Sequence, residues 1–149
     1  MKDIARQLRT IIAKVEPQLT RMNHDAVGFK PGPNEWSKKE ILGHLIDSAA
    51  NNHQRFVRAV NKVAAGFPTY DQNEWVRIQR HNERPWLSLV ELWSAYNSHV
   101  CHIIECIPKD ADSSPCNIGK KGPVPLDFVI KDYIRHLQHH LKDILDDQA

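Results

Sequence analysis

Four segments of the chain space their apolar residues three and four positions apart, and this pattern constrains the fold more than any other feature. That spacing lines side chains along one face of an α-helix, whereas a half-buried strand would need strict alternation. The predicted helices span about residues 1–24, 37–65, 88–107 and 125–146. Because an amphipathic helix cannot bury its stripe alone, we expect an all-α four-helix bundle without a sheet.

Local signals predict where these helices begin and end. Ser37–Glu40 and Ser88–Glu91 both have the capping-box pattern, in which Ser and Glu each satisfy a free backbone donor. The second helix is expected to end near Gly66. Pro17 predicts a kink or an early stop in the first helix, because proline lacks the donor and clashes with the preceding turn.

The predicted bundle has two long connections, at about residues 67–87 and 108–123. Connections of this length are usually functional or contain a short helix of their own. Residues 28–36 are rich in Gly and Pro and are predicted to form a loop. The connection at 67–87 has an aromatic density that suggests a pocket lid, from Phe67, Tyr70, Trp75 and Trp86.

Composition indicates one cytoplasmic domain over residues 1–149. A net charge of +2, without a cluster of Lys and Arg, argues against a nucleic-acid partner. No apolar run reaches the roughly 18–20 residues that span a bilayer, and the N-terminus does not resemble a signal peptide, so no membrane association is expected. Cys101 and Cys106 are expected to pack inside a helix, and Cys116 to be exposed in a loop.

Two histidines on the fourth predicted helix could bind one metal ion. His136 and His140 differ by about 40° in azimuth and about 6 Å in rise, which is typical of helical metal sites. His140 falls inside the apolar arc and His136 at its edge, whereas His139 points toward solvent. A buried hydrogen-bonded pair without metal is an equally good interpretation of this pattern alone.

A third histidine would distinguish these interpretations, because catalytic zinc sites commonly have three protein ligands. His44 lies on the flank of the second helix's apolar stripe, on the same side as Ser48, Asn51 and Arg55. By spacing alone, four other histidines compete with it: His24, His53, His99 and His102.

Three stretches of the sequence resemble the DinB/YfiT-like superfamily, whose members are regarded as metal-dependent hydrolases. Residues 36–48, WSKKEILGHLIDS, are similar to the superfamily's second-helix signature, and residues 133–141, YIRHLQHHL, to its closing HxxxH helix. Between them, residues 55–56, 70–71 and Trp75 resemble the YfiT branch. The resemblance covers most of the chain from residue 36 to 144.

The resemblance implies a four-helix bundle with a three-histidine site for zinc, nickel or a similar divalent ion. Carried over by position, the ligands are His44, His136 and His140. Some members of the superfamily resemble thiol-dependent S-transferases and isomerases that use bacillithiol or mycothiol. A small-molecule substrate, a low-molecular-weight thiol as partner and a homodimer are therefore expected.

The leading hypothesis is a metal-dependent hydrolase or thiol S-transferase, in which the metal activates water or a thiol. Asp47 and Asp132 are candidates to orient a ligand ring, although both also fit solvated surface carboxylates. Asn51 and Arg55 are candidate substrate contacts, or members of surface ion pairs. The alternative is a non-catalytic metal-binding or structural bundle, for which His99 is the nearest fourth ligand.

Overall fold

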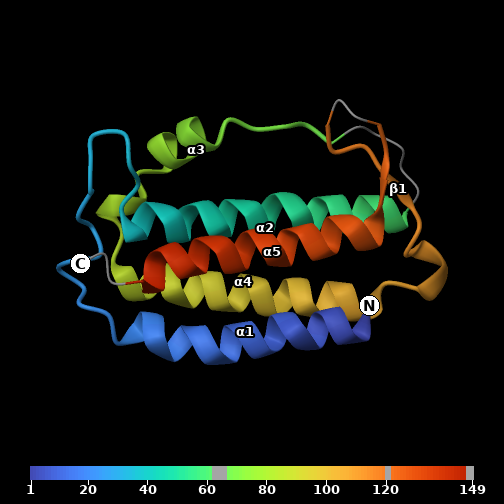
Figure 1. The fold of residues 1–149 in the computed structure, drawn as a ribbon, viewed down its shortest axis with the longest axis horizontal. Helices are drawn as coiled ribbons and strands as arrows, with labels where there is room; N and C mark the ends of the chain where they lie inside the picture. Colours follow the sequence, from blue (N-terminus) through green and yellow to red (C-terminus); the bar gives the residue numbers. More distant parts are fainter. Residues whose placement is uncertain (62–66, 120–121, 147–149) are drawn as a thin grey trace.

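The computed structural model describes residues 1–61, 67–119 and 122–146 and confirms the four-helix bundle (Figure 1). The four long helices are α1 (Lys2–Thr20), α2 (Lys38–Val60), α4 (Trp86–Cys106) and α5 (Leu126–Leu145). The connections contain α3 (Gln72–Gln79), the 3₁₀ turns η1 (His81–Glu83) and η2 (Lys109–Ala111), and the strands β1 (Pro115–Cys116) and β2 (Val124–Pro125).

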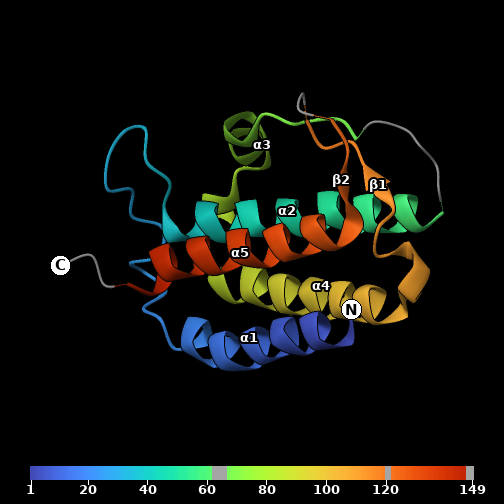
Figure 2. The same cartoon turned by 45° about the vertical axis from the view of Figure 1, so that its right-hand side comes forward.

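The order of the helices around the bundle brings distant parts of the sequence together. Both α1 and α2 pack against α4 and α5, so α1 and α2 lie diagonally across the bundle. Helix α2 runs antiparallel to α5, as Figures 1 and 2 show. The first turns of α2 therefore lie beside the last turns of α5, which are about 90 residues away along the chain.

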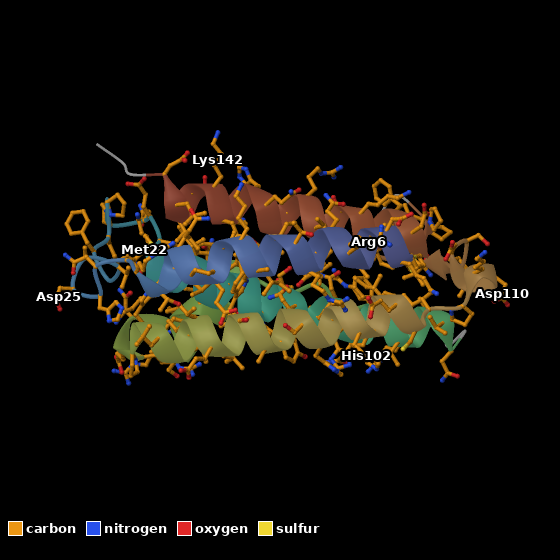
Figure 3. The ribbon with its side chains drawn as sticks, turned by 90° about the horizontal axis from the view of Figure 1, so that it is seen from below. Arg6, Met22, Asp25, His102, Asp110 and Lys142 are labelled. Carbon is orange, nitrogen blue, oxygen red and sulfur yellow. The ribbon has the colours of Figure 1, made fainter. Side chains whose placement is uncertain are left out.

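The apolar stripes form one continuous core. Its largest fully buried side chains include Phe56 on α2, Trp93 on α4 and Leu137 on α5. Helices α1 and α4, which face the viewer in Figure 3, are also joined by polar contacts. The Trp86 indole donates to the backbone oxygen of Leu19 at 2.7 Å, which fixes the start of α4 against the end of α1.

One predicted capping box is confirmed and the other is wrong. The Ser37 hydroxyl accepts from the Glu40 amide, and the Glu40 carboxylate accepts from the Ser37 amide. Helix α4 instead begins at Trp86, after Pro85, and has no side-chain cap. The buried indole and the φ angle set by proline start this helix one half-turn early, and the Ser88 hydroxyl accepts from the Arg84 guanidinium instead.

Three further expectations about the elements are corrected, and a fourth falls outside the described residues. Helix α1 passes through Pro17 without stopping there and ends at Thr20 rather than near residue 24. A small antiparallel pair exists where no sheet was expected, with Cys116 opposite Val124. Two-residue strands are too short to produce an alternating pattern in the sequence. The predicted end of the second helix near Gly66 lies in the part of the chain that is not described.

The long connection after α2 contains the short helix that its length suggested. Helix α3 lies over α2 in both ribbon views (Figures 1 and 2), and the side chain of Asp71 caps its start. The turn after it is tied to the beginning of α2, because Asn82 accepts a hydrogen bond from the Ser37 hydroxyl and another from the Lys39 ammonium group. Among the described helices, none has the length and apolarity to cross a membrane.

Candidate metal centre

Three histidines from two helices meet where the start of α2 lies beside the end of α5. One ring nitrogen from each of His44, His136 and His140 lies within 4.8 Å of the other two. The Nε2 atoms of His44 and His136 are 3.1 Å apart. Two imidazole nitrogens bound to one tetrahedral ion at about 2.0–2.1 Å would be about 3.3–3.4 Å apart. The side chains are thus already close to the spacing of a shared ion.

The surroundings keep these imidazoles neutral. His44 is fully buried, and the indole of Trp36 packs on it with ring centroids 4.9 Å apart. Burial, followed by the neighbouring His136, lowers the pKa of His44 to about 4. Burial, followed by His140, lowers the pKa of His136 to about 4 as well. Neutral imidazole is the form that binds a metal, so the free ligands need not lose protons at neutral pH.

The outer nitrogens of the rings also suit a metal. The Nδ1 atom of His140 lies 3.3 Å from a carboxylate oxygen of Asp143, the arrangement that directs Nε2 toward an ion. The Nδ1 atom of His44 is buried without a hydrogen-bond partner, and so is Oδ2 of Asp47, one turn further along α2. A ring that binds an ion through Nε2 carries its proton on Nδ1 and needs an acceptor there, and Asp47 is a buried carboxylate with a free oxygen on the same helix.

A fourth histidine is buried behind the cluster. His81, in η1, is 2% exposed, and its Nε2 atom is 3.9 Å from Oδ2 of Asp47. Its ring lies flat against Gly43, where a Cβ atom would overlap three atoms of the imidazole. Asp47 accepts a hydrogen bond from Gln79 through its other oxygen at 2.8 Å. Asp47 is therefore a buried group between two histidines, not the solvated carboxylate that its sequence position also allowed.

A cavity of about 580 Å³ opens beside the histidine cluster. His136 lines one part of it, and Arg55 and Tyr70 line another. Tyr70 belongs to the long connection that was expected to cover a pocket, and it stacks on Trp75. Trp86, by contrast, is part of α4 and lies in the core. Asn51 is absent from the described lining, and its side chain donates to the backbone oxygen of Asp47 instead.

The other candidate ligands lie elsewhere. His99 packs on His53 with ring centroids 5.0 Å apart, and His53 contacts the Tyr96 hydroxyl at 3.0 Å. In the described part of the chain, His99 is not among the ligand atoms that meet at His44, so it is wrong as the nearest fourth ligand. His102 is exposed on α4, where Figure 3 labels it, and His24 is exposed beyond the end of α1.

His139 and Asp132 are solvent-accessible residues of α5, and both line the cavity beside His136. The His139 side chain is 69% exposed, as its azimuth predicted. Asp132 forms an ion pair with Arg135, so it is a surface carboxylate and does not orient the ring of His136.

The expected exposure of two cysteines, Cys106 and Cys116, is wrong. Cys116 is buried in β1, not exposed, and Cys106 is exposed on α4. Cys101 is buried as expected, and burial raises its pKa to about 11. Burial also raises the pKa of Cys116. A thiol with a raised pKa is a poor nucleophile at neutral pH, so these two side chains pack as small apolar groups.

Comparisons with known proteins identify the family of the chain. A model of the DinB superfamily matches residues 7–144. The chain belongs to the DinB superfamily. A protein of Oceanobacillus iheyensis named "putative metal-dependent hydrolase" is 22% identical over 123 residues, which are 83% of this chain and 71% of that protein. A Bacillus mycoides protein with the same designation is 25% identical over 109 residues, 73% of this chain and 62% of its own length.

Two solved structures have the same fold. YfiT from Bacillus subtilis, described as a "probable metal-dependent hydrolase with an unusual four-helix bundle topology", matches with a TM-score of 0.84 and 17% identity. The match covers 96% of this chain and 83% of YfiT. A mycothiol-dependent maleylpyruvate isomerase matches with a TM-score of 0.76 and 15% identity, over 95% of this chain and 59% of the isomerase. At these identities, the likeness shows the fold alone.

For this DinB-superfamily protein, the lowered histidine pKa values predict an acid-sensitive metal-free state. In the unfolded chain the pKa of His44 and His136 returns to about 6.5, so the unfolded state binds more protons between pH 6.5 and about 4. The melting temperature of chelator-treated protein should therefore be highest above pH 6.5 and fall as the pH approaches 4. His136→Gln should flatten this fall, while the exposed His139→Gln should not. Parallel curves for both variants and the wild type would contradict the assignment.

Three side chains near the cluster were missed in the sequence. Asp143 follows His140 by three positions, so a carboxylate one turn beyond HxxxH was the available signal. Trp36 was visible only as part of a signature. His81 had no sequence signal, because its position beside Gly43 depends on how η1 packs on α2.

Proposed function

We propose that the protein is a metal-dependent enzyme that acts on a small molecule. His44, His136 and His140 would hold zinc or nickel, and the enzyme would be a hydrolase or a thiol-dependent transferase. When bound, such an ion lowers the pKa of water or of a thiol to near neutrality or below. The observation that carries the proposal is the cluster of three neutral imidazoles beside a cavity of about 580 Å³.

The ligand count favours an open site. Across residues 1–61, 67–119 and 122–146, the group that contains His44 has three members and no fourth His, Cys, Asp or Glu. Three protein ligands leave a coordination position for a reactant, whereas structural zinc sites are closed by four. Because His136 also lines the cavity, a reactant in the cavity would lie beside this position.

The remaining residues have supporting roles in this proposal. Asp143, 3.3 Å from Nδ1 of His140, would hold that ring with Nε2 toward the ion. Asp47, whose Oδ2 atom is buried without a partner one turn after His44, would accept the Nδ1 proton of His44 once the ion occupies Nε2. Trp36 shields one side of the cluster from water. The thiol alternative is supported by the likeness to a mycothiol-dependent isomerase. The homodimer and the cytoplasmic location stay predictions.

Elemental analysis of untagged protein, followed by activity screens of the zinc and nickel forms, tests the proposal. We expect about one divalent ion per chain, and hydrolysis or transfer of a low-molecular-weight thiol that stops after chelation. Exchange at the open position is measured separately, from the change that added thiol causes in the absorption spectrum of the cobalt(II) form. A cobalt spectrum that no thiol or small anion alters would indicate a closed structural site and contradict the enzyme proposal.

A further inference from the structure

One cation in the cavity, Arg55, has no partner among the side chains that the structure describes. Arg55 lines the cavity and is half-buried. Among the described residues, it makes no ion pair and no side-chain hydrogen bond. The cavity's other arginine, Arg135, is neutralised by Asp132. The fixed charge that the described side chains place in this cavity is therefore the guanidinium of Arg55.

Arg55 lies close enough to two other segments of the fold for its charge to act on them. Burial raises the pKa of the Tyr70 hydroxyl and of the Cys116 thiol, and the positive charge of Arg55 opposes this rise in both. Tyr70 lies in the connection above α2 and lines the cavity, and Cys116 lies in β1, two residues before Ile118, which also lines it.

Arg55 lies on the same face of α2 as His44, three turns further along the helix. His44 and Arg55 are eleven residues apart on α2, which gives a difference of about 20° in azimuth and about 16 Å in rise. Ser48 and Asn52 lie between them and also line the cavity. The cavity thus extends along α2 from His136, the member of the cluster that lines it, to the cation.

We propose that Arg55 binds an oxyanion at the far end of an elongated substrate whose reactive atom lies at the histidine cluster. The substrate class is then a small molecule with a carboxylate or phosphate several bonds away from its reactive group. The inference rests on the proposed function, since it takes the reactive end from the metal centre. A planar guanidinium binds either oxyanion through two parallel hydrogen bonds, and it does so more strongly where water is partly excluded.

Thiol probes of matched length test this site in the cobalt(II) form of the protein, through the thiolate absorption that they add. We expect mercaptooctanoate to bind at least about tenfold more tightly than mercaptooctanol, the size of one charged hydrogen bond. Arg55→Gln should remove this preference. Arg58→Gln, an equal charge change on the exposed side of α2, should keep it. Mercaptopropionate, too short to reach Arg55, should bind both variants equally, and mercaptooctyl phosphate shows which oxyanion is preferred.

Equal binding of the carboxylate and the alcohol by the wild type would overturn the inference, and so would an equal loss in Arg58→Gln. If cobalt binds but no thiol alters its spectrum, the proposed function fails by itself. The anion site is then tested on metal-free protein through the arginine side-chain NMR signal that disappears in Arg55→Gln. A shift of that signal with octanoate, and none with octanol, supports the site. An unchanged signal with both probes would contradict it.

Discussion

Replacing His140 by alanine should abolish tight binding of a divalent metal, whereas His139→Ala should leave the affinity almost unchanged. The two residues are adjacent, but their azimuths differ by about 100°. His140 points into the cluster, and the His139 side chain is 69% exposed. Removing a group that only hydrogen-bonds a metal-binding histidine costs about 10–100-fold in metal affinity. Removing the histidine itself should therefore cost more than about a hundredfold. Competition with a chromophoric chelator, on untagged protein, measures both affinities.

A second group of possible metal ligands lies on α5, and the same variants distinguish it from the proposed centre. Ligand atoms of His139, His140 and Asp143 also lie within 4.8 Å of one another, with His139 exposed and the other two residues half-buried. Metal bound there would be lost in both His139→Ala and His140→Ala. Such a result would contradict the site on α2 and α5. His44→Ala separates the two directly, because it removes a ligand from the proposed centre and none from this surface group.

Gly43→Ala should destabilise the protein, although alanine is the better helix former. In an open helix this change would stabilise by about 0.8–1.0 kcal/mol. Here the new Cβ would overlap the buried ring of His81, and overpacking of this kind costs about 1–3 kcal/mol or more. The expulsion of His81 would also leave Asp47 without its neighbour. We expect a net loss of about 2 kcal/mol, or about 4–8 °C in melting temperature.

Gly43→Ala should stabilise the protein, rather than destabilise it, when His81 is absent. In a His81→Ala background the Cβ that Gly43→Ala adds has no ring to meet, so the change should raise the melting temperature by its helix propensity alone. Gly119→Ala serves as the control, because nothing lies within 4 Å of its Cβ position. The same loss of stability in both backgrounds would mean that the contact with His81 is not the cause.

Much of the fold was predictable because its signals are local. The spacing of apolar residues depends only on the helical repeat, and it identified the four long helices. The capping box at Ser37–Glu40 is complete within four residues, so it could be read directly. The box at Ser88–Glu91 failed because the start of α4 is set by a tertiary contact, the burial of Trp86 under Leu19. A local motif predicts a helix start only where no distant contact competes with it.

The candidate site likewise combines features that one helix sets by itself with features that depend on packing between helices. The azimuths of His136, His139 and His140 follow from one helix, and the inward and outward directions were predicted correctly. The choice of His44 over His53 or His99 followed from the resemblance, since spacing alone left these alternatives open. The structure brings His44 to the pair because α2 runs antiparallel to α5.

The sequence by itself determined the helices, their apolar faces and the pairing of His136 with His140, because these depend on residues within a few turns of one another. Only the tertiary structure decided that Asp47 is buried between His44 and His81, and that Cys116 is inside. It also decided that Arg55 faces the cavity. These outcomes depend on how the connections between helices fold back over α2, and that packing joins residues whose separation in the chain has no periodic signature.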